Sequence, residues 1–307
     1  MFTLADRFKL QYPSIFKIPY SKEDFQFLHT FTEHCVLKSF EAFFEGLFGV
    51  PFDKNYEQLK NKTEEGSIDF ESLEKMRIKM KTKNQRAATE PIRFTEKPIF
   101  LNMLSNISEK LGYNSPLNWT TVRILFDICR YDYGWNNDKI SPWCAFFSEN
   151  EQKILEYYED LSCYYEYGYG NELAREMGCN QIKSLIYNFM KVANGDKHPK
   201  AVVHTSHRAY FETLQVALDI TKDPYILTAD NFETAQDRKW RTTNDCPYAT
   251  QFTAVFYSCN NEEKYVHFTM NEKSLDEINF PGCKDGLCPW SSVFNRLKPI
   301  ANTCNLD

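Results

Sequence analysis

Apolar side chains recur at helical spacing near the start of the chain. In residues 36–49, "VLKSFEAFFEGLFG", Phe40, Phe44 and Leu47 fall on one face of a helix. Gly49 follows the last apolar residue and is placed to end the helix. This stretch therefore predicts an amphipathic helix that contributes to a core.

Two further helices are predicted between residues 148 and 190. Ser148 and Glu151 have the spacing of a capping box, which marks the start of a helix, and Gly168 and Gly170 in "YGYGN" are placed to end it. The next helix has its apolar face at Ile182, Leu185, Ile186 and Phe189. From about residue 100 to residue 200 the pattern is helical.

Short apolar runs rich in β-branched and aromatic residues predict strands at both ends of the chain. They are "FQFLHTF" (25–31), "AVVHTSHR" (201–208), "ATQFTAVFYSC" (249–259) and "KYVHFTM" (264–270). A helix is predicted to follow the second run, starting at Glu212. Residues 53–100 are polar and lysine-rich and are expected to be the least regular part.

This order of elements predicts an α/β fold. Its core is formed by residues 1–50 and 201–307, and residues 51–200 form a mostly helical insertion. A chain of 307 residues with 42% hydrophobic residues is long enough to bury such a core. No stretch approaches eighteen apolar residues, so no membrane span is expected.

Charge and cysteine content narrow the class of protein. A net charge of −6 is not the basic charge that is typical of a protein that binds nucleic acid. Ten cysteines and three glycosylation sequons, at Asn61, Asn106 and Asn118, favour the secretory pathway, either as a secreted protein or in the lumen of the endoplasmic reticulum. The N-terminus lacks the zones of a signal peptide, so the sequence is expected to begin after a processing point or from an incomplete gene model. Chance sequons and reduced buried thiols are the alternative interpretation.

Two disulfides are favoured. Cys283 and Cys288 bracket the turn-rich "KDG", where a local disulfide is geometrically plausible, and Cys129 with Cys144 is the other preferred pair. The six remaining cysteines allow fifteen connectivities if all are bridged. No CxxC occurs, so a structural zinc site has little support.

Several stretches in order resemble the multiple inositol polyphosphate phosphatases, a branch of the histidine acid phosphatases. They are "LADRFKLQYPSIF", "HCVLKSFEAFFEGLFG", "SPWCAFFSENEQKILEYYEDL", "YYEYGYG", "RKWRTTNDCPYATQFTAVFYSC" and "FPGCKDGLCPW". The resemblance implies a twisted sheet with flanking helices, an inserted helical cap domain, and a pocket at the sheet edge. It also implies disulfides, glycans, removal of phosphate from inositol polyphosphates, and no metal or cofactor.

In that family a neutral histidine from an RHGxRxP motif attacks phosphorus, arginines neutralise the oxygens, and an acid protonates the leaving alcohol. None of the six histidines of this chain is followed by glycine, so the motif is absent. The core strand that carries it is expected to be missing from this sequence. Loss of a covalent nucleophile costs on the order of a millionfold in turnover in other hydrolases.

Two other pocket positions depart from the family pattern. His34 stands where the resemblance implies an arginine at a helix start, and Tyr210-Phe211-Glu212 matches the His-Ala-Glu triplet without a gap. Glu212 is then a residual acid, or a carboxylate at a helix start. A shifted alignment instead brings His207 into the pocket, with "HRAYFE" as an expanded triplet; metal chelation by His204 with His207 is not expected.

Arg238, Lys239 and Arg241 in "RKWRTT" could line a pocket for a polyanion or could pair with carboxylates. The basic run Lys75 to Arg86 is either a solvated face or a second patch for a polyanion.

Two functional hypotheses follow. One is a degenerate, non-hydrolysing protein on the phosphatase fold that binds an inositol polyphosphate or another anionic or small ligand. The other is part of an active phosphatase whose N-terminal segment is missing from the record or is supplied by a partner chain that completes the sheet.

Overall fold

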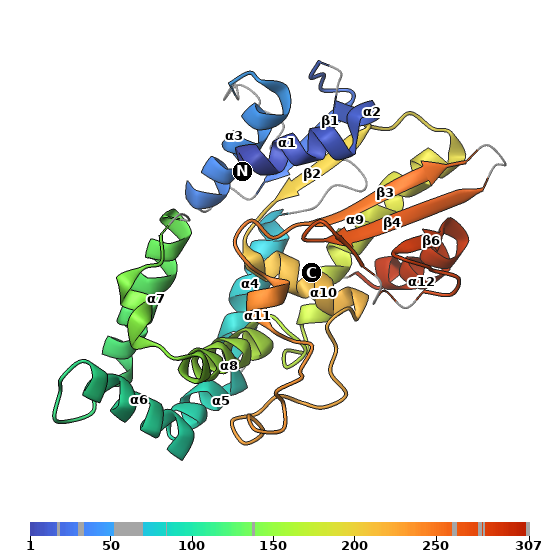
Figure 1. Cartoon of the computed structure of the whole chain (residues 1–307). Helices are drawn as coiled ribbons and strands as arrows, with labels where there is room; N and C mark the ends of the chain where they lie inside the picture. The colour runs from blue at the N-terminus through green and yellow to red at the C-terminus, as the bar shows by residue number, and fades with distance from the viewer. Residues whose placement is uncertain are drawn as a thin grey trace. The chain divides into compact units, whose positions relative to one another are not determined.

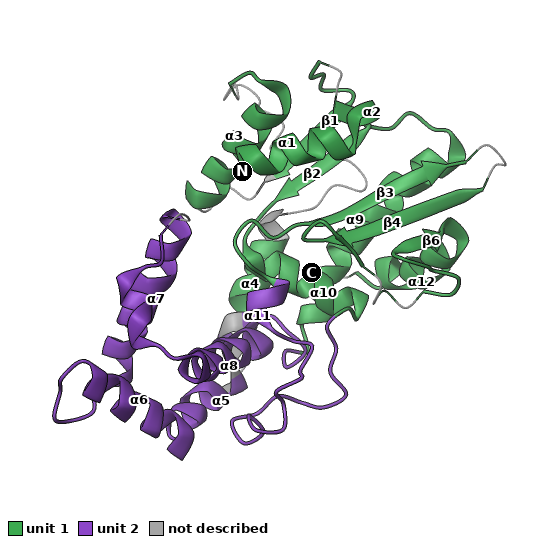
Figure 2. Ribbon diagram, viewed as in Figure 1, with its two compact units in different colours: residues 1–79, 172–220, 246–307 green, residues 80–171, 221–245 purple. Residues whose placement is uncertain are grey.

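The structure is a computed structural model, and it divides into two compact units (Figure 2). The first comprises residues 1–79, 172–220 and 246–307, and the second comprises residues 80–171 and 221–245. The residues that the structure describes are 1–16, 19–29, 34–51, 70–83, 85–136, 139–259, 263–275, 278 and 280–304. Helices and strands mix in the first unit, which confirms the α/β class.

The strands of the first unit form two small sheets (Figure 1). β1 (Phe25–His29) and β2 (Ala201–Thr205) pair in parallel. β3 (Phe252–Ser258) and β4 (Lys264–Met270) pair antiparallel, and β4 also pairs with β5 (Lys273–Ser274) and β6 (Leu287–Pro289). The four longer strands lie within the four predicted runs, so those predictions are confirmed.

Helices cover the strands of the first unit. They are α1 (Phe2–Gln11), α2 (Pro13–Phe16), α3 (His34–Phe48), α9 (Ala174–Asn194), α10 (Arg208–Leu218) and α12 (Trp290–Asn302). α4 (Phe70–Lys83) begins in this unit and runs across its boundary. α3 has the predicted apolar face, and Gly49 follows it with a positive φ of 70°, as expected for a helix end.

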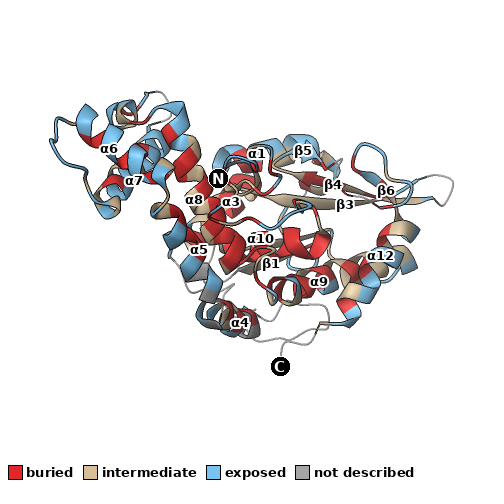
Figure 3. Cartoon of the chain, turned by 90° about the horizontal axis from the view of Figure 1, so that it is seen from below, coloured by how far each residue is buried: buried red, intermediate tan, exposed pale blue. Residues whose placement is uncertain are grey.

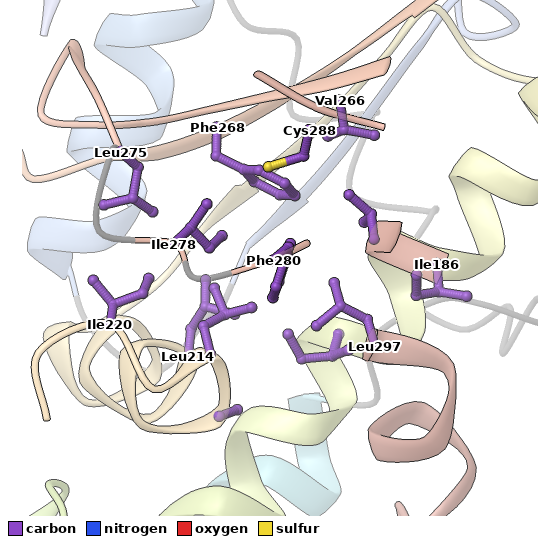
Figure 4. Close-up of a cluster of buried hydrophobic side chains, with 14 of the residues drawn as sticks. Ile186, Leu214, Ile220, Val266, Phe268, Leu275, Ile278, Phe280, Cys288 and Leu297 are labelled. Carbon is purple, nitrogen blue, oxygen red and sulfur yellow. The ribbon is translucent and has the colours of Figure 1, made fainter. Parts of the chain in front are cut away.

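The described residues of the first unit include two buried apolar clusters. Figure 3 shows the buried residues in red. One joins α1, α3 and β1 and is rich in phenylalanine, with Phe25, Phe40 and Phe44 each 1% exposed. The other lies between α9, α10, α12 and β4 and includes Val266, Phe268 and Leu297 (Figure 4). Alternate residues of β3 contact opposite clusters, because successive side chains of a strand point to opposite faces.

The second unit is helical. It contains α5 (Gln85–Thr95), α6 (Pro98–Lys110), α7 (Trp119–Trp135), a 3₁₀ helix (Pro142–Phe146), α8 (Glu149–Glu166) and α11 (Thr242–Asp245). The capping box is confirmed: the Ser148 hydroxyl accepts from the Glu151 backbone N–H, and the Glu151 carboxylate accepts from the Ser148 backbone N–H. Among the described residues, no helix is both long and apolar enough to cross a membrane.

The units do not follow the boundaries expected from the sequence. α9 lies in the predicted insertion 51–200 but packs against α10 and α12, and Cys179 in α9 is bonded to Cys304 after α12. Residues 221–245, expected in the core, instead join the second unit through Arg238 and its partners on α8. Side-chain contacts distant in sequence decide both assignments.

Two local predictions were wrong. Residues 70–100, expected to be irregular, form α4, α5 and the start of α6, because α4 buries Leu73, Met76 and Met80 at helical spacing despite its charge. The basic run from Lys75 is therefore helical. The helix predicted from Glu212 begins four residues earlier, at Arg208.

Three disulfides join cysteines within the described ranges. Cys129–Cys144 and Cys283–Cys288 confirm the two preferred pairs. The third, Cys179–Cys304, joins cysteines 125 residues apart, so no local pattern predicts it.

Candidate functional site

The candidate site lies where β2 ends and α10 begins. β2 ends at Thr205, and His207 has the extended backbone of an N-cap residue, with φ −75° and ψ 154°. β1 runs parallel to β2, so both strands end at the same edge of the small sheet. A helix N-terminus at such an edge favours negative charge.

Tyr210 lies in the first turn of α10 and points its hydroxyl at α4. Its side chain is buried, and Oη donates to Glu74 Oε2 over 3.3 Å. Its backbone carbonyl accepts from Gln181 Nε2 of α9 over 2.6 Å. Both contacts fix the tyrosine at the start of the helix.

Glu74 is the carboxylate of this group. Arg77, one turn later on α4, donates to it through Nε (2.8 Å to Oε2) and Nη2 (2.6 Å to Oε1). The hydrogen bond from Arg77 is the largest cause that lowers the pKa of Glu74; burial opposes it, and Tyr210 and a positive charge on His207 add to the lowering. Glu74, Arg77 and Tyr210 therefore form one polar group, which we call the α4–α10 cluster.

The α4–α10 cluster changes how the predicted triplet is read. Tyr210, Phe211 and Glu212 were matched to a strand end, but the structure has them inside α10. His207, which the shifted alignment used, lies two residues after the end of β2, at the N-cap of α10. Glu212 follows it by five positions and is buried, with 1% exposed, in the second turn of the helix. A role for Glu212 as an acid stays a prediction.

The sequence held a signal for the earlier helix start. Tyr210, Leu214 and Ala217 lie at helical spacing and are all buried, so the apolar pattern of α10 already includes Tyr210. Glu74 had no such signal, since it lies 136 residues before Tyr210 in the chain.

His34 is the first residue of α3 and is exposed. This agrees with the helix-start position that the sequence predicted. Within the described part of the chain, no recorded side-chain contact joins His34 to the α4–α10 cluster.

In the basic stretch 238–241, both arginines form ion pairs with carboxylates of the second unit. The Arg238 side chain is 1% exposed and pairs with Asp160 Oδ2 at 2.5 Å and with Glu156 Oε2 at 3.1 Å. Arg241 pairs with Glu156 Oε2 at 2.5 Å, whereas Lys239 is exposed. The pairing interpretation thus accounts for both arginines, although the Arg241 side chain keeps 29% of its area exposed.

Asp160 is the residue that sequence reasoning missed here. Its side chain is fully buried, and Oδ1 accepts from the Thr242 backbone N–H and hydroxyl. Burial raises the pKa of Asp160 to about 6, although Arg238 and Thr242 favour the ionised form. The spacing of Glu156 and Asp160, four residues apart on a predicted helix, was the available signal, because it puts both carboxylates on one face.

His204 on β2 makes the stability of the fold depend on pH. Desolvation lowers the pKa of His204 to about 4 from the ordinary value of 6.5. The unfolded chain then binds the proton more tightly, so the free energy of unfolding should fall by up to about 3 kcal/mol as pH drops from about 6.5 to about 4. Urea denaturation at several pH values in this range gives the free energy of unfolding at each pH. This free energy should change less with pH for His204→Gln than for the unaltered chain. Equal changes in both would contradict the assignment.

The asparagines of two of the three sequons are exposed in the described part of the chain. Asn106 is exposed on α6, and Asn118 is the exposed N-cap of α7, where Oδ1 accepts from the Thr121 backbone N–H over 2.9 Å. Asn61 lies outside the described residues. In the described ranges, no group of three or more His, Cys, Asp or Glu side chains could hold a metal ion.

Comparisons with known proteins give the family. Multiple inositol polyphosphate phosphatase 1 of Drosophila melanogaster is 30% identical over 306 residues, which cover 97% of this chain and 62% of that protein. The protein of the same name from Homo sapiens is 26% identical over 316 residues, covering 96% of this chain and 64% of that protein. The chain thus spans less than two thirds of these relatives.

The fold has a relative of known structure. A crystal structure of the phytase from D. castellii matches with a TM-score of 0.76 and 19% identity, covering 99% of this chain and 64% of that one. Residues 1–271 match the family model described as histidine phosphatase superfamily (branch 2). Because this match covers most of the chain, the protein belongs to branch 2 of the histidine phosphatase superfamily.

Proposed function

We propose that this chain is a non-hydrolysing member of its superfamily that binds an anionic ligand of the inositol polyphosphate class. One observation carries the proposal: none of the six histidines is followed by glycine, so the chain lacks the RHGxRxP nucleophile that the resemblance implies. The names of the relatives support the ligand class, since they include inositol polyphosphate phosphatases.

The start of α10 is the proposed ligand site. His207 is the N-cap of α10, two residues after β2 ends, and the shifted alignment makes it the phosphate-binding histidine that the resemblance implies. The backbone N–H groups of the first turn of α10 favour an anion. A protonated imidazole adds positive charge. The acid needed for leaving-group protonation is not two residues later, because that position holds Ala209.

The test is phosphate release from inositol hexakisphosphate, measured alongside binding. We expect the purified chain to bind the ligand by calorimetry and to release no phosphate above the uncatalysed background. His207→Ala should weaken binding, whereas Lys139→Met, at an exposed position of the second unit, should not. Turnover at about 1 s⁻¹ or faster would overturn the proposal.

A second candidate is favoured by the open strand edges. β2 pairs with β1, and β3 pairs with β4; within the described residues neither strand has a backbone partner on its other edge. Val203 of β2 and Val255 of β3 pack on the same cluster of α1 and α3. An added strand could join both edges. The second candidate is therefore one part of an active phosphatase whose further strand comes from another segment or chain.

The mass of the protein from its natural source separates the two candidates. A longer chain, or a second chain that stays bound under native conditions and leaves under denaturing ones, would favour the active phosphatase. A single chain of 36.2 kDa plus any modification would favour the non-hydrolysing protein.

We also propose a secreted or luminal protein with glycans on Asn106 and Asn118. Both side chains are exposed, and the helix-capping contact of Asn118 uses Oδ1, which leaves Nδ2 for the glycan. Treatment of the natural protein with a peptide N-glycosidase should lower its mass. An unchanged mass would contradict the glycan assignment.

A further inference from the structure

α4 brings a protein carboxylate to the proposed anion site. Leu73 and Met76 are buried, with 0% and 4% exposed, and they anchor the helix by apolar packing on either side of Glu74. Glu74 itself keeps about a quarter of its side chain in solvent, 24% by exposed area. α4 and α10 lie close together in the first unit (Figure 1), and the contact from Tyr210 Oη joins them.

The groups around Glu74 are those that recognise an oxyanion. Arg77 presents a two-pronged guanidinium, Tyr210 donates a hydroxyl hydrogen, and His207 contributes positive charge when protonated. Carboxylates and phosphates share this recognition chemistry, because both accept charge-assisted hydrogen bonds from arginine forks. The donors that could hold a phosphate therefore already hold a carboxylate.

A second anion cannot join Glu74 at this place without a large cost. Two like charges a few ångströms apart disfavour each other's ionised state. Arg77 and Tyr210 also favour the ionised form of Glu74, since they lower its pKa. A phosphate at the start of α10 thus has to displace the carboxylate.

We infer that Glu74 is an internal competitor for the ligand: its carboxylate accepts from Arg77 and from the Tyr210 hydroxyl, the donors beside the start of α10 that a bound phosphate group would use. The inference rests on the proposed function, since it assigns a regulator to the same site. It makes α4 an autoinhibitory element, and it makes Arg77 a ligand-binding residue once Glu74 leaves.

The experiment compares four variants by calorimetry with inositol hexakisphosphate and with inorganic phosphate. Glu74→Gln keeps the shape and removes the charge, and we expect it to raise affinity for both at least about tenfold. The double variant Glu74→Gln/Arg77→Gln should lose this gain, because the released guanidinium is what captures the phosphate. Arg77→Gln alone keeps the carboxylate and should not raise affinity.

Asp127→Asn is the matched control. Asp127 pairs with Arg130 three residues later on α7, the same spacing as Glu74 and Arg77, but it belongs to the second unit. We expect it to leave affinity unchanged, which shows that the gain is not a general effect of lower negative charge. Thermal unfolding of each variant confirms that the fold is retained, as expected for an isosteric change at a partly exposed side chain.

The outcomes separate this inference from the proposed function. If the unaltered chain and Glu74→Gln bind inositol hexakisphosphate equally well, the competitor role is wrong and the proposed function stands. If Asp127→Asn gains as much affinity as Glu74→Gln, the competitor role is also wrong. If no variant binds either ligand, both the competitor role and the proposed function are overturned.

Discussion

Arg238→Met should lower the free energy of unfolding by about 3–5 kcal/mol. The substitution leaves Asp160 and Glu156 without their shared partner, and the Asp160 side chain is fully buried. A buried carboxylate without a counter-charge is costly because protein stabilises it less than water does. Urea denaturation at neutral pH measures the loss.

The size of this loss should depend on pH in a defined direction. Burial already raises the pKa of Asp160 to about 6, and removal of Arg238 raises it further. A group whose pKa is raised on folding takes up a proton on folding, so its contribution favours the folded state at low pH and is lost as pH rises. The deficit of Arg238→Met should therefore be smaller at about pH 5 than at about pH 8.

Lys239→Met is the matched control, because Lys239 is the exposed neighbour of Arg238. It should change stability by less than about 0.5 kcal/mol. The pair also tests the ligand-binding role considered for this stretch. If Arg238→Met keeps full stability and instead weakens binding of inositol hexakisphosphate, Arg238 serves the ligand rather than the fold.

Gly178→Ala should destabilise the first unit by about 3 kcal/mol. A Cβ atom on Gly178 would lie 2.0 Å from the carbonyl oxygen of Thr213 and 2.8 Å from Cβ of Ala217. The clash is with backbone, so no side-chain rotation relieves it, and α9 would have to move away from α10. Thermal or urea unfolding measures the effect.

Gly134→Ala is the control for this prediction. Gly134 also lies within a helix, α7, but nothing is within 4 Å of its added Cβ. Alanine favours a helix over glycine by up to about 1 kcal/mol, so this variant should be neutral or slightly more stable. If both substitutions change stability by the same amount, the close approach of α9 and α10 at Gly178 is not the cause of the loss.

The candidate site was predictable only in part. The sequence located the segment from His204 to Glu212 and identified His207 as one of two possible pocket residues. It did not settle the start of α10, because a β-branched run followed by polar residues fits either a longer strand or an earlier helix. Burial of Tyr210 against α4 and α9 decided between them, through Glu74 and Gln181.

The sequence by itself determined what depends on neighbours in the chain. The capping box at Ser148, the helix end at Gly49, the four strands and the Cys283–Cys288 disulfide all arise within about a dozen residues, where periodicity and turn chemistry act directly. The absence of the His-Gly pair is likewise a property of the sequence alone.

Tertiary structure decided which distant groups meet. Glu74 reaches Tyr210 across 136 residues, Arg238 reaches Asp160 across 78, and Cys179 reaches Cys304 across 125. Apolar periodicity predicts that one face of a helix or strand is buried, but it does not predict which other element packs against that face. That choice depends on the packing of the whole unit, so the carboxylate at the start of α10 and the partner of Arg238 became visible only in the folded chain.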